Sequence, residues 1–260
     1  MSLTLAPSQS LAQTLESLSL KVMANEHQAL AELFEKNKKS FVDYLGELAS
    51  REAEHRYQLK ISRLLKNAKL PRNKLLKDFE VDRIPGLSAS YVQSLIGGEF
   101  IDRYENLLIF GNPGTGKTHL SIALAREWCV ANRRVLYISA ANLVQQLLIA
   151  KRSLSLEQYI KRLDAFEILV IDDISYIPFE ASETDVLFTL LAARYEMRSV
   201  LITSNLPFAN WNKIFKDEMT TAAAIDRLVH HATILELNTE SYRMANAKKR
   251  NSKPPLKKDK

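Results

Sequence analysis

The sequence predicts an α/β protein in which a parallel β-sheet flanked by helices follows a small all-helical domain. From Glu105 onward, short β-rich runs alternate with helical stretches, as they do in parallel sheets covered on both faces. Residues 11–68 contain almost no Gly or Pro apart from Gly46, and their apolar residues recur at helical spacing. A glycine-rich segment at residues 111–118 joins the first expected strand to a helix.

The bulk composition narrows the class of protein. The 260 residues are 46% hydrophobic and 25% charged, so we expect a folded chain with room for a small domain and an α/β domain. The single cysteine, Cys129, excludes an internal disulfide, and we expect it to pack inside a helix. We find neither a run of about 18 apolar residues nor a signal-peptide pattern, so we expect a cytoplasmic protein.

The N-terminal helical domain is predicted to span residues 1–72 and to contain two or three helices. Its last helix, roughly residues 50–67, should end before Pro71 because proline disfavours helix at the residue before it. The α/β domain is predicted over residues 73–247. Residues 248–260 are rich in lysine and contain two prolines, and we expect them to form a disordered basic tail.

The α/β domain should begin with a Gly- and Pro-containing connector at residues 71–100. The expected strands and helices then alternate. The strands are predicted at Leu107–Phe110, Val135–Ser139, Ile168–Ile171, Val200–Thr203 and Ile234–Leu237. The helices are predicted at Gly116–Ala131, Ala141–Lys151, Thr184–Glu196 and Thr220–His230.

The glycine-rich segment reads Gly-Asn-Pro-Gly-Thr-Gly-Lys-Thr and matches the phosphate-binding pattern G-x-x-x-x-G-K-[ST]. Its glycines let backbone N–H groups face the phosphates, and the following helix presents its positive end there. Lys117 should reach the terminal phosphates of ATP, and Thr118 should offer its hydroxyl to Mg²⁺. The expected nucleotide-binding residues are Gly111, Asn112, Pro113, Gly114, Thr115, Gly116, Lys117, Thr118 and His119.

Polar side chains follow two later strands. The apolar run at residues 168–171 ends in Asp172 and Asp173. Asp172 should lie at the carboxyl edge of the sheet and hold Mg²⁺, while Asp173 could orient or deprotonate the attacking water. Asn205 follows the next strand and could hold that water through its amide, although a turn-forming role before Pro207 is equally compatible with the sequence.

Two arginines come later in the chain. Arg227 lies near the end of a predicted helix, and Arg243 lies just past the last strand. Arginine is suited to stabilising charge on a transferring phosphoryl group. Either residue alone is more typical of a charged surface; their order after the other motifs is what makes them candidates.

The chain closely resembles the IstB family, ATPase helpers encoded beside the transposase in a group of bacterial insertion sequences, and more distantly the DnaC helicase loaders. Both belong to the AAA+ group. The resemblance covers about residues 15–250 and rests on GNPGTGKTHL (111–120), VIDD (170–173), RYEMRSVLITSNL (194–206), DRL (226–228) and ESYR (240–243).

This resemblance implies an AAA+ core and a role in DNA transposition. By position, Asn205 resembles the sensor-one residue, Arg227 the arginine finger that acts on a neighbouring subunit's ATP, and Arg243 the sensor-two arginine. It therefore implies an ATP-dependent homo-oligomer that binds DNA, recruits a transposase, and associates with the bacterial nucleoid when bound to DNA. Many AAA+ proteins have Glu where this chain has Asp173, so hydrolysis could be slow or depend on a partner.

Basic residues suggest where DNA could bind. Arg56, Lys60 and Arg63 fall at i, i+4 and i+7 of one predicted helix and share a face. They begin a block of eight basic residues without an acid at residues 56–77, which favours backbone contacts to nucleic acid with little sequence preference. The alternatives to DNA binding are that these residues form a solvated helix face or a face that docks the transposase. Weaker candidates are Lys151, Arg152, Lys161 and Arg162.

The sequence is also compatible with other functions. A helicase loader would share the fold, and a nucleotide-gated DNA scaffold with little hydrolysis would fit Asp173. A small P-loop kinase would need an Arg-rich lid, and no such segment is evident. His230 and His231 are adjacent near the end of a predicted helix, so we expect them to point to different faces and to share no metal.

Overall fold

The computed structural model describes residues 10–175, 179–214, 218–242 and 244. The predicted tail at 248–260 lies outside this range. Packing contacts divide the chain into two units after Arg63, within the long helix α3 (Phe41–Asn67). None of the helices in the described ranges combines the length and the apolar character needed to cross a bilayer.

The first unit consists of α1 (Leu11–Ser17), α2 (Lys21–Lys36) and most of α3. The helix expected from residue 50 already begins at Phe41, because Gly46 is tolerated inside it. Leu30, Phe34 and Leu48 form a small buried cluster. The apolar core of this unit is small, so polar contacts between its helices contribute a larger share of its stability.

Glu52 of α3 provides the main polar contact of this unit. Its Oε2 accepts hydrogen bonds from the backbone N–H groups of Val22 and Met23 at 2.8 and 3.2 Å, so it satisfies donors in the first turn of α2. Arg56 donates to Glu52 at 3.0 Å and to the Ser19 carbonyl at 3.0 Å. A carboxylate on one helix thus caps the start of another.

The second unit contains a five-stranded parallel sheet in the order β2-β3-β4-β1-β5. The five predicted strands are present, and the α/β prediction is confirmed. The last strand begins at Ala232 rather than Ile234, because Ala232 pairs with Asn106 at the start of β1. The strands are β1 (Asn106–Phe110), β2 (Val135–Ser139), β3 (Ile168–Asp172), β4 (Ser199–Ser204) and β5 (Ala232–Glu236).

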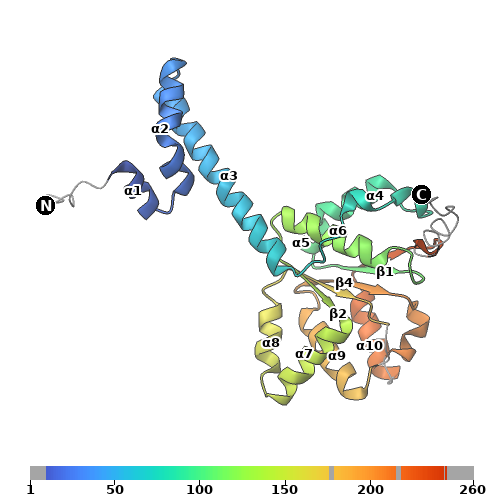
Figure 1. Ribbon diagram of the computed structural model, residues 1–260. Coiled ribbons are helices and arrows are strands. Elements are labelled where there is room, and N and C mark those ends of the chain that lie inside the picture. Colours follow the sequence, from blue (N-terminus) through green and yellow to red (C-terminus); the bar gives the residue numbers. More distant parts are fainter. Residues whose placement is uncertain (1–9, 176–178, 215–217, 243, 245–260) are drawn as a thin grey trace, which may run out of the picture. The chain divides into compact units, whose positions relative to one another are not determined.

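Helices cover both faces of the sheet (Figure 1). On one face α6 (Lys117–Val130) and α4 (Ala89–Gly97) pack against it, and on the other face lie α7 (Ala140–Arg152), α9 (Ala181–Arg194) and α10 (Glu218–Val229). Alternate residues of a strand belong to the two cores: Leu107 and Ile109 lie in the core that includes α6, whereas Leu108 and Phe110 lie in the core on the other face. Burial on both faces explains the nearly continuous apolar strand sequences.

The connector is more structured than the sequence predicted. It forms two short 3₁₀ helices, η1 (Leu76–Asp78) and η2 (Val81–Arg83), then α4 and α5 (Glu99–Asp102). Its residues Ile84 and Leu87 are buried in the core beneath α6. A further helix not expected from the sequence, α8 (Leu156–Leu163), follows α7.

The expectation that the adjacent histidines lie within a helix and point to its different faces is wrong. Helix α10 ends at Val229, so His230 and His231 lie in the turn that leads into β5, and the spacing of side chains around a helix does not apply to them. Their ring centroids are 4.1 Å apart.

Candidate nucleotide-binding site

The loop from β1 to α6 curls tightly at the carboxyl end of the sheet. Gly111 has a φ of 152°, and a Cβ placed on it would lie 2.7 Å from the Leu237 carbonyl oxygen. Gly116 has a φ of 107°, a value that L-residues rarely adopt, and it precedes the first residue of α6. These two positions therefore require glycine for close backbone packing and for the turn into the helix.

Lys117 begins α6, and its side chain turns back over the loop. Its Nζ donates to the carbonyl oxygens of Gly111 and Asn112 at 2.6 and 3.0 Å. The side chain is buried. Thr115 closes the same loop by donating to the Asn112 carbonyl at 2.9 Å. The loop thus presents an ammonium group and a helix N-terminus at one place, which suits a polyphosphate.

Asp172 lies at the centre of a network of hydroxyl groups. Its Oδ1 accepts hydrogen bonds from Thr118 of α6 at 3.0 Å and from Thr203 of β4 at 2.7 Å. Its Oδ2 accepts one from Tyr137 of β2 at 2.8 Å. The carboxylate is buried, so these donors compensate for lost hydration. Three neighbouring strands and the first turn of α6 together fix its position.

The tyrosine in this network is held in its neutral form. Burial raises the pKa of Tyr137, and the negative charge of Asp172 and the hydrogen bond to it raise the pKa further. A neutral phenol can donate one hydrogen bond, and here it donates to the carboxylate. Sequence reasoning missed Tyr137 and Thr203, because a residue in mid-strand carries no motif; only the strand order brings them beside Asp172.

Asp173 and Asn205 follow β3 and β4. The N–H of Asp173 donates to the Thr203 hydroxyl at 2.8 Å, and Asp173 has a φ of 60°, an uncommon backbone conformation for a residue other than glycine. Oδ1 of Asn205 accepts from the Ser175 hydroxyl at 2.5 Å, and the Asn205 N–H donates to Ser175 Oγ at 2.9 Å. Both residues line the same pocket.

That pocket has a volume of about 360 Å³, within the range of small-molecule sites. The pocket is lined by the loop from Pro113 to His119 and by Asp173, Thr203 and Asn205. Gly111, Asn112 and Asp172 contact two residues that line the pocket, Lys117 and Thr118. Its other lining residues were not predicted from the sequence: Lys74, Asp78, Phe79, Glu80, Arg83, Ile84, Thr239, Glu240 and Tyr242.

The connector forms one wall of the pocket because specific contacts hold it there. A ring nitrogen of His119 contacts the Leu75 carbonyl at 2.8 Å, and its ring lies edge-to-face with Phe79 at 5.4 Å. The Arg83 guanidinium lies 4.8 Å from the centre of the Tyr242 ring. His119 therefore positions the wall beside the loop. No short motif marks this wall in the sequence.

Of the two candidate arginines, the structure describes Arg227. Arg227 is not among the described residues that line the pocket. On α10, Arg227 donates to the Ala223 carbonyl at 3.2 Å and its guanidinium lies 5.0 Å from the centre of the Phe188 ring. Arg243 lies outside the described residues. Thus the structure does not bring Arg227 to the nucleotide pocket of its own chain.

The candidate DNA-binding residues differ in what they contact. Arg56 is engaged with Glu52 and Ser19, whereas Lys60 and Arg63 are exposed on α3. Of the weaker candidates, Lys151 lies 3.7 Å from Asp185 and Lys161 lies 2.7 Å from Glu157. The Arg162 guanidinium lies 5.3 Å from the centre of the Tyr159 ring, and Arg152 is exposed. Acidic partners therefore reduce the positive potential at two of these positions.

Solved structures share the fold of this chain. It is similar to AMPPCP-bound DnaA from Aquifex aeolicus, with a TM-score of 0.55 and 19% identity over 74% of this chain and 58% of the DnaA chain. It is also similar to the DnaC helicase loader, with a TM-score of 0.52 and 15% identity over 64% of this chain and 97% of the loader. These similarities identify the AAA+ fold.

Sequence comparisons are more specific. An insertion-sequence ATP-binding protein of Sinorhizobium fredii is 43% identical over 78% of this chain and 69% of its own length. The IS21 ATP-binding protein of Pseudomonas aeruginosa is 35% identical over 90% of this chain and 89% of its own length. The family model described as "IstB-like ATP binding protein" matches residues 13–251. This chain therefore belongs to the family of IstB-like ATP-binding proteins.

Proposed function

We propose that this chain is a DNA-binding AAA+ ATPase that assembles on DNA in an ATP-dependent manner and assists a transposase in target selection and insertion. The observation that carries this proposal is the single pocket that unites the phosphate-binding loop, the strand-end residues Asp173 and Asn205, and the Asp172 network behind it. The names of its relatives, as insertion-sequence ATP-binding proteins, support the transposition context.

Within this proposal the loop holds the triphosphate. Lys117 would exchange its carbonyl contacts for phosphate oxygens, while the N–H groups of the loop face the same anion. Thr118 and Asp172 would hold Mg²⁺ together with water, because hard oxygen donors suit this cation and the two side chains are 3.0 Å apart. Bound Mg²⁺ would neutralise part of the negative charge of the phosphates.

Asp173 and Asn205 are proposed to act on the water that attacks the terminal phosphate. Both line the pocket beside Thr203. The Asp173 carboxylate is one methylene shorter than glutamate, so its reach toward that water is reduced, and we expect slow turnover unless DNA or a partner accelerates it. A nucleotide-gated scaffold with little hydrolysis is the second candidate function, and the same residue favours it.

Arg227 is proposed to serve the ATP of a neighbouring subunit. It lies away from the pocket of its own chain, so a role in phosphoryl chemistry requires a second copy. Arg243, proposed as a sensor-two arginine, would act from within its own chain. The arrangement makes ATP hydrolysis depend on assembly.

DNA is proposed to bind through exposed basic side chains, chiefly Lys60 and Arg63 on α3. Both can contact phosphates without reading bases, so affinity should fall steeply with salt and depend little on sequence. A helicase loader, the function named for the DnaC structure, would use the same site chemistry with a different partner.

The first experiment is light scattering of the purified chain in four samples: without additions, with ATP and Mg²⁺, with duplex DNA, and with all three. A large assembly only in the last sample supports ATP-gated assembly on DNA. A monomer in every sample contradicts the proposal, because Arg227 then has no neighbour to serve. Adding a transposase of the same insertion-sequence family, or a replicative helicase, to the assembly then distinguishes the two partner classes by co-elution.

A further inference from the structure

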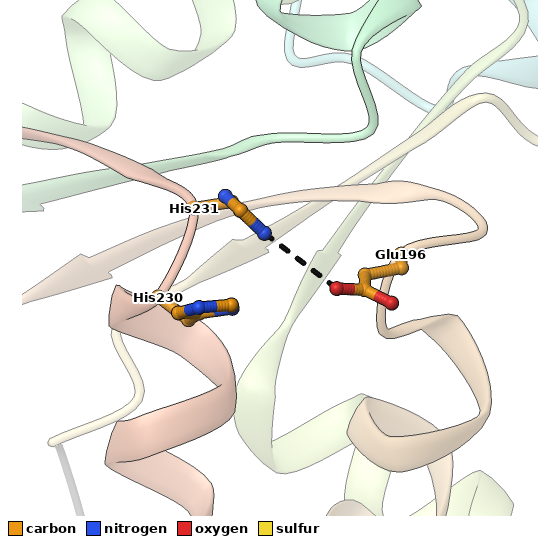
Figure 2. A group of neighbouring side chains, drawn as sticks. All are labelled: Glu196, His230 and His231. Atoms are coloured by element: carbon orange, nitrogen blue, oxygen red, sulfur yellow. Dashed lines mark ion pairs between the residues drawn. The ribbon is translucent and has the colours of Figure 1, made fainter.

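Three metal-ligating side chains meet at the end of the sheet where β4 and β5 begin. Glu196 lies in the turn between α9 and β4, and His230 and His231 lie in the turn between α10 and β5. Nε2 of His231 is 3.5 Å from Oε1 of Glu196, and one ligand atom from each of the three side chains lies within 4.8 Å of the others. Figure 2 shows His231 and Glu196 pointing toward each other beside His230.

Asn106, at the start of β1, contacts the backbone of segments next to both turns. Its backbone N–H donates to the His231 carbonyl at 2.7 Å. Its side chain donates to the Leu228 carbonyl and accepts from the Val200 N–H, both at 3.1 Å. Asn106 is buried. Asn106 therefore holds the start of β4 beside the turn between α10 and β5, through contacts that do not involve the three side chains themselves.

The donor set and spacing suit a divalent transition metal. Imidazole nitrogen and carboxylate oxygen are zinc ligands with bonds of about 2.0–2.2 Å, so tetrahedral coordination places ligand atoms about 3.4 Å apart. The 3.5 Å separation of His231 and Glu196 matches this value. All three side chains are exposed, so His230 can approach by a small side-chain rotation.

Neighbouring side chains act on two of the three residues. The Tyr195 hydroxyl contacts Nδ1 of His230 at 2.7 Å, the kind of outer contact that fixes metal-bound imidazoles. The carboxylate of Glu105 lies close enough to His231 for their charges to interact, although Arg103 is its main partner.

We propose that Glu196, His230 and His231 form a zinc-class metal site, with water in the fourth position. One ion would link the turn after α9 to the turn after α10. It would thereby restrain the end of α10, the helix that contains Arg227. Metal binding at this site requires neither nucleotide binding nor hydrolysis.

Zinc titration by calorimetry tests the site, with the full chain freed of any histidine tag and of nucleotide. We expect one ion per chain, and we expect Glu196→Gln, His230→Gln and His231→Gln each to weaken binding by at least about tenfold. The combined triple variant should lose it. Zinc should also raise the melting temperature of the unaltered chain but not that of the triple variant.

Two controls separate this site from others. His55→Gln changes a histidine on α3, and Asp172→Asn changes the proposed Mg²⁺ site; both should bind zinc as the unaltered chain does. Burial raises the pKa of Cys129 to about 11, so this thiol does not compete as a ligand. The proposal is overturned if the unaltered chain binds no zinc, if the triple variant binds it equally well, or if only Asp172→Asn loses binding.

Discussion

The hydroxyl of Tyr137 donates a hydrogen bond to Oδ2 of Asp172 at 2.8 Å. The other carboxylate oxygen accepts from Thr118 and Thr203, so the tyrosine fixes the rotation of the carboxylate from the opposite side. Burial and the neighbouring charge raise the pKa of Tyr137, which keeps this donor protonated at neutral pH. The orientation of the proposed Mg²⁺ ligand therefore depends on a residue outside every nucleotide-binding motif.

Replacing Tyr137 with Phe tests this dependence. Loss of a hydrogen bond behind a metal ligand typically weakens metal binding about 10–100-fold, so the Mg²⁺ concentration for half-maximal ATP turnover should rise about tenfold. ATP binding without Mg²⁺ should change little. Tyr159→Phe is a matched control, because its hydroxyl contacts Gln146 on the surface. An unchanged Mg²⁺ dependence would show that Thr118 and Thr203 suffice to orient Asp172.

Lys117→Ala should abolish tight ATP binding. A charged hydrogen bond contributes about 1.5–3 kcal/mol, so removing one such bond to phosphate should weaken affinity about 10–100-fold, as measured by fluorescent-nucleotide titration. Lys151→Ala, which removes an exposed lysine paired with Asp185, is the control. Thermal denaturation must accompany the titration, because Lys117 also holds the carbonyls of Gly111 and Asn112. Parent-like affinity in a folded variant would remove Lys117 from the phosphate site.

The sequence was most informative where function imposes a fixed spacing. The loop at residues 111–118 and the two aspartates at the end of β3 could be placed before the structure, because phosphate and metal binding demand particular residues at strand ends. The pocket brings Asp173 and Asn205 together as parallel strands require. The α/β class followed from strands alternating with helices.

Contacts that depend on tertiary packing could not be predicted. The wall formed by Phe79, Arg83 and Tyr242 unites segments far apart in the chain, and nothing local in either segment indicates the other. The histidine pair was misjudged because the end of α10 falls one residue earlier than the pattern suggested, and helix boundaries are the least certain part of any sequence-based assignment. Nothing in the sequence indicated that Arg56, a predicted DNA contact, also holds Glu52 and Ser19.

Arg227→Ala should retain ATP binding but lose turnover, because the proposed stabilising charge acts on a neighbour's ATP; arginine fingers contribute about 10³–10⁵-fold to rate. Asp172→Asn should lose turnover for a different reason. Mixing the two inactive variants should restore part of the ATPase activity measured by phosphate release, since some interfaces then combine an intact pocket with an intact arginine. Mixtures that stay inactive, while light scattering shows that they co-assemble, would contradict a finger acting between subunits.

Neutralising Lys60 and Arg63 together should weaken DNA binding and flatten its salt dependence. Removing one cation from a DNA phosphate reduces the slope of log K against log salt by about 0.9, so the slope of the double Gln variant should fall by about two units, as measured by fluorescence anisotropy. Arg51→Gln is the control, because Arg51 is paired with Glu26 and Glu47 on the same unit. Arg56 is left unchanged because its replacement would disturb the helix contacts. An unaltered slope would place the DNA site elsewhere.

Glu52 should make the first unit sensitive to acid. Burial alone would raise its pKa, but hydrogen bonds from the Met23 N–H, from Arg56 and from the Val22 N–H outweigh burial and lower the pKa below its ordinary value of 4.5. A carboxyl group whose pKa is lower in the folded state than in the unfolded state stabilises the fold at pH values above its unfolded-state pKa. This stabilisation is lost as the pH falls through the folded-state pKa. Protection of the Val22 and Met23 amides should therefore decline below about pH 4.5.

Glu52→Gln separates this effect from general acid unfolding. A neutral amide is a weaker acceptor for the two N–H groups and for Arg56, so the variant should already lose about 1–3 kcal/mol of local stability at pH 7. Hydrogen exchange read by mass spectrometry over residues 20–30 should then show faster exchange at pH 7 and a smaller change on acidification. Glu54→Gln, on the exposed side of α3, should behave as the unaltered chain does. If both variants keep full protection at pH 7, the small apolar cluster around Phe34 holds α2 against α3 without the buried carboxylate.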